Sequence, residues 1–251
     1  MTAAQSCEMF LNNTSSRYAG AAHRSITYER DTMLPVVSIV GASDSGKTTF
    51  LEKLIPELAA RGYRVGAVKH DAHGFEMDRE GKDTWRLRRA GAEVIAISSP
   101  DQFASIRSTD REMSLEEIAG RFFWTEDILV TEGFKTARYP KIEVFRSALE
   151  PKPVCGPGDN LIALVSDDAV DMQVPRFSST DWRGVAAFIE DRYLRGRKKR
   201  KMLVQLDGKQ LPMKDFVEDF VLGGIEGMLS SLRGWDKPRT VSIHIRLGED
   251  D

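Results

Sequence analysis

Residues 41–48, which read GASDSGKT, have the types and spacing of a phosphate-binding loop, GxxxxGK[ST]. The glycines permit the positive φ angles needed by a tight loop whose amides point inward, and a helical pattern follows. Lys47 would pair with the β- and γ-phosphates of a nucleotide, and the Thr48 hydroxyl would bind Mg²⁺. The segment therefore predicts a nucleotide site. The alternative is a glycine-rich strand-to-helix turn that carries an ordinary lysine.

A second candidate is Glu132, in the stretch DILVTEGFK at residues 127–135. An apolar strand pattern ends there, at the sheet edge where P-loop proteins bind their nucleotide. A carboxylate in this place can hold magnesium directly or through water, and it can also polarise an attacking water. Glu132 is thus a candidate for metal binding and for catalysis, and a solvated turn at the end of a strand is the alternative.

The polar stretch at residues 69–93 would begin at the same edge, because it follows another strand pattern. Its two histidines, His70 and His73, fall short of the three or four ligands that a zinc site needs. We therefore expect them to contact a ligand by hydrogen bonds or to belong to plain loop structure. Asp78 opens DREG, which matches the DxxG switch motif of many GTPases, although about one match is expected by chance in a chain of this size.

Guanine recognition has two candidate carboxylates, Asp167 and Asp168 in LIALVSDD, of which Asp167 is preferred. The NKxD motif of standard guanine recognition is absent from the sequence. A carboxylate following this late strand could accept hydrogen bonds from guanine N1–H and N2–H, which adenine does not offer. The alternative is turn chemistry.

Short apolar runs alternate with helical patterns from Leu34 onward, which is typical of strands covered on both faces. We therefore predict an α/β fold, a P-loop NTPase-type mostly parallel sheet flanked by helices. One helix carries a capping box, Ser114 with Glu117. Strand patterns lie at 35–40, 64–69, 93–98, 127–131, 141–146 and 160–165, and helical patterns at 48–61, 82–90, 114–123 and 181–194.

The chain divides into four predicted parts. Residues 1–33 have no sustained period and are expected to form a mobile tail, with Met33 as an alternative start. Residues 34–194 form the P-loop domain. Residues 195–201, RGRKKRK, are interpreted as a basic linker, with nucleic-acid or acidic-lipid binding as the alternative. Residues 202–251 are predicted to form a small ββαβ module, with a hairpin around Asp207-Gly208, and its role would be dimerisation or partner docking.

The composition argues against several classes of protein. The 251 residues carry a net charge of −2, which gives no general attraction to nucleic acid or membrane. No apolar run approaches the ~20 residues of a membrane helix, and the first residues do not resemble a secretion signal. Cys7 and Cys155 lie far apart and form no CxxC, so a reducing, cytoplasmic setting is expected.

Four blocks together resemble the MobB family of molybdopterin-guanine dinucleotide biosynthesis adapter proteins over residues 34–194. They are GASDSGKTTFLEKLIPEL, KHDAHGFEMDREGKDTWRLRRAGA, DILVTEGFK followed by PKIEVFR, and IALVSDD. The resemblance implies a dimeric protein that binds GTP and Mg²⁺ and hydrolyses GTP weakly. It also implies the partners, which are the nucleotidyltransferase MobA and the apo-molybdoenzymes. The tail before Met33 and the module after residue 201 depart from the family pattern.

The resemblance also implies roles for individual positions. Thr48 and Glu132 would serve magnesium, and three residues would line the same cleft, namely Asp78, Lys82 and Lys135. Phosphate binding would fall to Gly41, Asp44, Ser45, Gly46, Lys47, Thr48 and Thr49. No convincing arginine finger or water-positioning glutamine is found, so slow hydrolysis is expected. Two other functions stay open, a metallochaperone GTPase and an ATP-dependent ligase or kinase resembling dethiobiotin synthetase.

Overall fold

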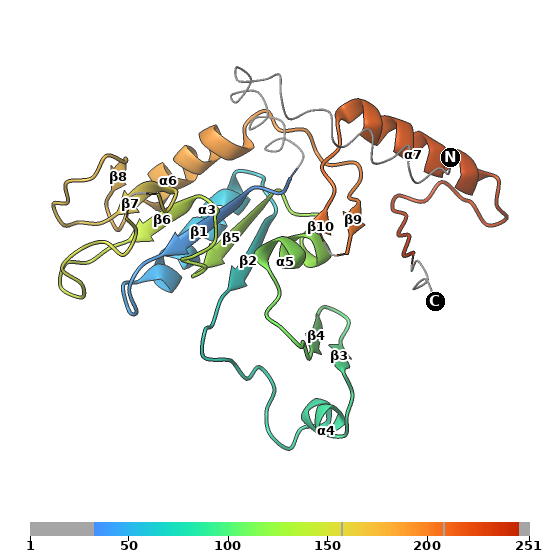
Figure 1. Ribbon diagram of the computed structural model, residues 1–251, viewed down its shortest axis with the longest axis horizontal. Helices are drawn as coiled ribbons and strands as arrows, with labels where there is room; N and C mark the ends of the chain where they lie inside the picture. The colour runs from blue at the N-terminus through green and yellow to red at the C-terminus, as the bar shows by residue number, and fades with distance from the viewer. Residues whose placement is uncertain (1–32, 157, 208, 246–251) are drawn as a thin grey trace, which may run out of the picture. The chain divides into compact units, whose positions relative to one another are not determined.

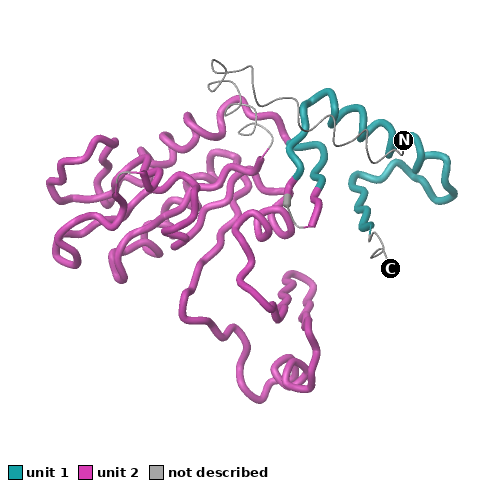
Figure 2. The backbone as a smooth tube through the Cα atoms, viewed as in Figure 1, with its two compact units in different colours: residues 1–32, 200–204, 211–251 teal, residues 33–199, 205–210 magenta. Residues whose placement is uncertain are grey.

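The computed structural model describes residues 33–156, 158–207 and 209–245. The chain separates into two compact units (Figure 2). One contains residues 33–199 and 205–210, and the described part of the other contains residues 200–204 and 211–245. The predicted tail falls outside the described residues, apart from Met33.

The first unit is built on a six-stranded sheet with the order β2-β5-β1-β6-β7-β8 (Figure 1). Every neighbouring pair in it runs parallel. This confirms the predicted α/β class with a mostly parallel sheet. The last strand was not foreseen, since it is only two residues long. The strands are β1 (Val36–Val40), β2 (Val65–Lys69), β5 (Ile128–Glu132), β6 (Lys141–Val144), β7 (Leu161–Val165) and β8 (Arg176–Phe177).

Three helices accompany the sheet: α3 (Lys47–Ala60), α5 (Leu115–Phe122) and α6 (Trp182–Ile189), the last continuing as a π-helical turn, η1 (Glu190–Leu194). The predicted capping box starts α5. Ser114 Oγ accepts the Glu117 amide at 3.2 Å, and Glu117 Oε2 accepts the Ser114 amide at 2.9 Å. Asp181 begins α6 by accepting the Gly184 amide at 2.9 Å.

The two faces of the sheet carry separate apolar cores. Val37 and Ile39 of β1 pack with Leu54 and Leu58 of α3, and all four are fully buried. Val36, the alternate residue of the same strand, packs instead with α5. Each buried leucine contributes about 1.5–3 kcal/mol to the free energy of folding. The continuous apolar pattern of β1 is therefore explained by burial on both faces.

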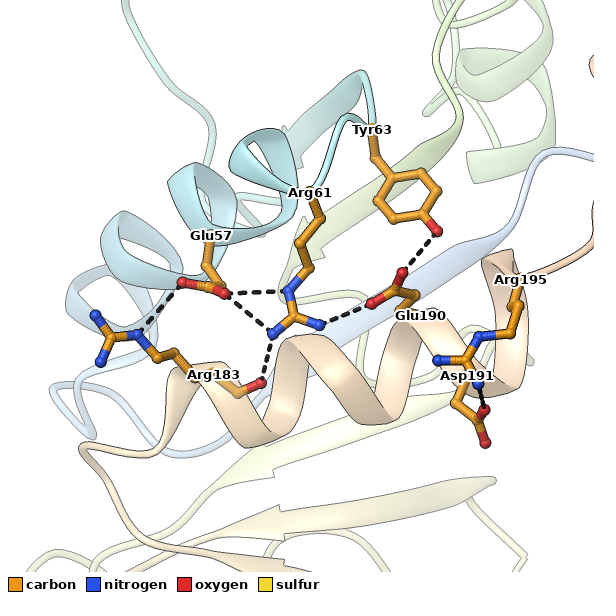
Figure 3. Close-up of polar contacts among 7 residues, drawn as sticks. All are labelled: Glu57, Arg61, Tyr63, Arg183, Glu190, Asp191 and Arg195. Atoms are coloured by element: carbon orange, nitrogen blue, oxygen red, sulfur yellow. Dashed lines mark hydrogen bonds and ion pairs between the residues drawn. The ribbon is translucent and has the colours of Figure 1, made fainter.

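A polar network joins the C-terminal end of α3 to α6 and η1 (Figure 3). The Arg61 guanidinium donates to Glu190 Oε2 at 2.7 Å and to Glu57 Oε1 at 3.1 Å. It also reaches the Arg183 carbonyl at 3.3 Å, and the Tyr63 hydroxyl donates to Glu190 Oε1 at 3.1 Å. The hydrogen bond from Arg61, and after it the one from Tyr63, lowers the pKa of Glu190. The network thus ties α3 to α6 and η1.

The segment between β2 and α5 differs from the expectation. Helix α4 (Asp83–Arg89) forms as predicted, but β3 (Val94–Ser98) does not enter the main sheet. It pairs antiparallel with β4 (Phe103–Arg107), a strand that was not foreseen. Both strands are largely exposed, so the apolar run of β3 was wrongly interpreted as a strand covered on both faces.

The C-terminal module predicted over residues 202–251 stays a prediction, because the hairpin at residues 205–210 belongs to the first unit and the helix after it to the second. β9 (Gln205–Leu206) and β10 (Lys209–Gln210) pair antiparallel, with Asp207 at a φ of 50°, and α7 (Asp215–Ser230) is helical. Residues 241–245 form no strand, and the rest of the predicted last strand lies outside the described residues. A strand needs a hydrogen-bonded neighbour, and the described residues offer this stretch none. Among the described helices, none is long and apolar enough to cross a membrane.

Candidate nucleotide-binding site

The loop between β1 and α3 has the backbone that its glycines were expected to allow. Gly41 and Gly46 have φ angles of 145° and 95°, and Asp44 also lies at a positive φ of 58°. A Cβ on Gly41 would stand 2.3 Å from the Val144 carbonyl oxygen and 2.8 Å from Ser45 Oγ. Only glycine therefore lets the loop lie this close to β6.

The loop leaves the start of α3 open to an anion. Gly46 occupies the N-cap position, and no side chain among the described residues caps it. The first turn of α3 contains no acidic residue either. Its amides therefore keep the partial positive charge of a helix N-terminus. Thr48 and Thr49 are exposed in this first turn, whereas Ser45 is buried inside the loop, where its Oγ has no partner among the described residues.

Lys47 lies folded back over the loop, where its ammonium donates to the Ala42 carbonyl. Burial lowers the pKa of Lys47, whereas the carboxylate of Glu132 raises it. Lys135 and Lys69 act on the same ammonium and lower its pKa further. The Asp44 carboxylate raises the pKa of Lys47 in turn, so three lysines and two carboxylates influence one another here, the predicted residues Asp44 and Lys135 among them. Such a group is suited to an anion with several negative charges.

The two predicted magnesium ligands are brought together. Thr48 Oγ1 donates to Glu132 Oε2 at 2.7 Å, across 84 residues of sequence. The Glu132 side chain is only 14% exposed, and its other oxygen lies 3.6 Å from Lys69 Nζ. A hydroxyl beside a carboxylate is a pair of hard oxygen donors, the type that Mg²⁺ prefers. The residues present therefore fit this ion, and Thr48 and Glu132 would hold it.

Asp78 and Lys82 are not brought to this site by any contact of the described residues. Asp78 Oδ1 accepts the Thr84 hydroxyl at 3.0 Å and the Arg79 amide at 2.9 Å, which organises the turn before α4. Lys82 is the N-cap residue of α4. Their predicted place in the nucleotide cleft stays a prediction.

The aspartates after β7 make turn contacts. Asp167 accepts the Ser179 amide at 2.9 Å and the Ser179 hydroxyl, and these hydrogen bonds lower its pKa. Asp168 Oδ2 accepts the Ser147 amide at 2.7 Å. This is the turn chemistry named above as the alternative. Each Asp167 oxygen keeps a further lone pair, so its guanine contact also stays a prediction.

The histidines also make loop contacts. His70 Nε2 lies 2.6 Å from Glu112 Oε1, and its ring packs on Phe134 with centroids 4.7 Å apart. The His73 amide donates to Asp71 at 3.0 Å. Within the described part of the chain, no group of three or more His, Cys, Asp or Glu is arranged to hold a metal ion.

Two cations at the site were missed by sequence reasoning. Lys69 contacts Glu132, and the Arg146 guanidinium lies beside Gly46. A signal for both was present, because Lys69 ends β2 and Arg146 follows β6 at the carboxyl edge of the parallel sheet. Ligands bind at this edge in open α/β sheets.

Comparison with known proteins found a matching family and several relatives. A family model described as "MobB: Molybdopterin guanine dinucleotide synthesis protein B" matches residues 36–167. The molybdopterin-guanine dinucleotide biosynthesis adapter protein of Haemophilus influenzae is 35% identical over 159 residues, which is 63% of this chain and 89% of that protein. The crystal structure of Bacillus subtilis MobB superposes with a TM-score of 0.53 at 31% identity, covering 65% of this chain and 99% of that one.

A longer relative matches more of the chain. The putative adapter protein of Methanocaldococcus jannaschii is 26% identical over 237 residues, covering 84% of this chain and 97% of its own. Since 84% of 251 residues is about 211, this match reaches beyond residue 200. The C-terminal part of the chain is thus shared at least in part with this relative.

Proposed function

Because the chain belongs to the MobB family of molybdopterin-guanine dinucleotide biosynthesis adapter proteins, we propose that it binds GTP with Mg²⁺ and assists a MobA-like nucleotidyltransferase. The observation that carries the proposal is the contact between Thr48 and Glu132 beside an uncapped helix N-terminus. This arrangement would provide a place for the phosphates next to a place for their metal ion.

Different residues would bind the phosphates and the metal ion. The amides of residues 45–48 would receive the phosphates, and the Lys47 ammonium would exchange the Ala42 carbonyl for a phosphate oxygen. Thr48 and Glu132 would hold Mg²⁺, with the Lys69 ammonium balancing the Glu132 carboxylate. A bound Mg²⁺ neutralises charge on the β- and γ-phosphates.

Hydrolysis is proposed to be slow. Glu132 is the carboxylate in contact with Thr48, and it has two tasks, holding the metal ion and polarising water. One group serves both tasks poorly at the same time. We therefore expect turnover far below ~1 s⁻¹, the low end for ordinary enzymes. Slow turnover suits an adapter, which needs the bound nucleotide to persist while it meets its partners.

The partners proposed are a second copy of the chain, a MobA-like enzyme and apo-molybdoenzymes, in the cytoplasm. The second copy is supported by the two-stranded sheet of β3 and β4. Ile97 and Phe103 on it are 61% and 71% exposed, and Leu87 on α4 is 58% exposed. A two-stranded sheet is marginally stable in water by itself, so cover from another copy would stabilise it.

The test is nucleotide binding by titration calorimetry, with GTP and ATP compared in the presence of Mg²⁺. We expect GTP to be preferred and Lys47→Ala to weaken its affinity at least about tenfold, the cost of losing one charge-assisted contact. Lys53→Ala is the matched control, since it removes the same charge from an exposed position on α3. Glu132→Gln should chiefly change the Mg²⁺ concentration needed for binding.

Two outcomes would contradict the proposal. Equal GTP affinity in Lys47→Ala and wild type would show that the loop is only a structural turn. Rapid consumption of ATP with a small acid substrate would instead support a ligase or kinase resembling dethiobiotin synthetase.

A further inference from the structure

The Arg146 side chain reaches the phosphate-binding loop from the side opposite Glu132. β1 lies between β5, which ends in Glu132, and β6, which Arg146 follows. Arg146 Nη2 is 3.1 Å, and Cζ 3.7 Å, from the point where a Cβ on Gly46 would stand. The guanidinium therefore lies beside the N-cap residue of α3, next to the amides that would receive phosphate.

The backbone around Arg146 is held firmly. The Phe145 amide donates to the Val165 carbonyl at 2.9 Å, and the Ser147 amide donates to Asp168 Oδ2 at 2.7 Å. The Arg146 carbonyl accepts the Leu149 amide at 3.1 Å. The residues on both sides of Arg146 are thus anchored to β7 and to the turn that follows it. Asp168 acts here as a positioning residue.

The guanidinium has a different environment from its backbone. Among the described residues no hydrogen bond or ion pair involves this group, and its positive charge contributes to the lowered pKa of Asp167. A guanidinium offers five N–H donors in a planar fork that suits phosphate oxygens. An anchored arginine beside an anion-binding turn, with its donors available, is equipped to bind an anionic ligand.

We propose that Arg146 is a second cationic ligand of the bound nucleotide and contacts its diphosphate from the β6 side. The inference rests on the proposed nucleotide site and adds a residue to it. Arg146 and Glu132 follow strands on opposite sides of β1, so the contact of Arg146 is expected not to depend on a metal ion held by Glu132. The ligand class is a nucleoside diphosphate or triphosphate. Arg146 would not increase the affinity for a nucleoside that lacks phosphate.

The experiment measures GDP affinity by calorimetry with Mg²⁺ and again with EDTA. We expect Arg146→Ala to weaken GDP binding about 10- to 100-fold under both conditions, the cost of losing a charge-assisted contact. Arg146→Lys should fall in between, since it keeps the charge and loses the fork. Arg138→Ala is the matched control, because this arginine is 78% exposed and precedes β6 at its other end. It should bind as wild type does.

The outcomes separate this inference from the proposed function. If Lys47→Ala weakens GDP binding while Arg146→Ala binds like wild type, the nucleotide site stands and the role of Arg146 is overturned. A loss that appears only with Mg²⁺ would also overturn it, because the effect would then act through the metal site. If the wild-type protein binds neither GDP nor GTP, the proposed function fails and this inference fails with it.

Discussion

Gly41→Ala should disrupt the loop between β1 and α3 more than a glycine replacement that only strains the backbone. At Gly41 the φ angle is 145°, and an added Cβ would stand 2.3 Å from the Val144 carbonyl oxygen. An ordinary contact measures 3.4–4 Å, so loop and strand would have to separate by more than 1 Å. The obstacle is backbone of the central strand β6, which has little freedom to move.

The cost can be divided into two parts by a matched control. Gly62 has a φ of 93°, but an added Cβ there would meet nothing within 4 Å. Backbone strain lowers the stability of both variants by about 1–3 kcal/mol. Overpacking lowers the stability of Gly41→Ala alone by about 1–3 kcal/mol more. Since about 2–4 °C of melting temperature corresponds to 1 kcal/mol in a domain of this size, Gly41→Ala should melt about 2–12 °C below Gly62→Ala.

Two measurements check this reasoning. Thermal unfolding followed by circular dichroism gives the two melting temperatures. GTP titration well below both of them should show affinity lost in Gly41→Ala and kept in Gly62→Ala. If both variants melt together and bind GTP equally, the loop does not depend on the close approach to β6, and the geometric argument for the site is refuted.

Two further predictions concern the elements around the site. Arg111, followed by the Ser114 amide, lowers the pKa of Glu117 from its ordinary 4.5 to about 2. The folded state therefore favours the ionised form, so the stability advantage of wild type over Glu117→Gln should be complete above pH ~5 and should shrink between pH 4.5 and about 2 in urea unfolding. Glu190→Gln removes the charged partner of Arg61 and should lower the urea midpoint at pH 7, while Asp191→Asn, whose ion pair with Arg195 is exposed, should change it little. An unchanged midpoint in Glu190→Gln would show that the network does not hold α3 to α6.

The sequence was sufficient to predict features that depend on local chemistry. The positive φ angles at Gly41 and Gly46, the capping box at Ser114 and the parallel sheet of apolar strands all follow from residue types at fixed spacings. Pairing partners were harder to predict. The run at 94–98 is as apolar as a core strand, yet it pairs with β4 and stays exposed, because strand order depends on distant contacts.

Site residues divide in the same way. Thr48 and Glu132 were predicted because each lies in a recognisable sequence motif. In the folded chain Thr48 Oγ1 lies 2.7 Å from Glu132 Oε2. Lys69 and Arg146 lie in no such motif, and only their positions at the ends of β2 and β6 identify them as candidates. Asp78 matched a motif, but its contacts lie within its own turn. Position at the carboxyl edge of the sheet therefore points to candidate residues that short motifs do not identify.

The order of the strands arranges charged groups in a fixed order along the carboxyl edge of the sheet. Starting from β2, it reads as the Lys69 ammonium, the Glu132 carboxylate, the loop amides with Lys47, the Arg146 guanidinium, and the carboxylates of Asp167 and Asp168. In the proposed complex, Mg²⁺ held by Thr48 and Glu132 would draw the terminal phosphates of the nucleotide towards β5. Its nucleoside would then lie towards β6 and β7, beyond Arg146. Taken with the proposed function, the strand order therefore predicts that the phosphate end of the nucleotide meets Glu132 and that the base end meets Asp167 and Asp168.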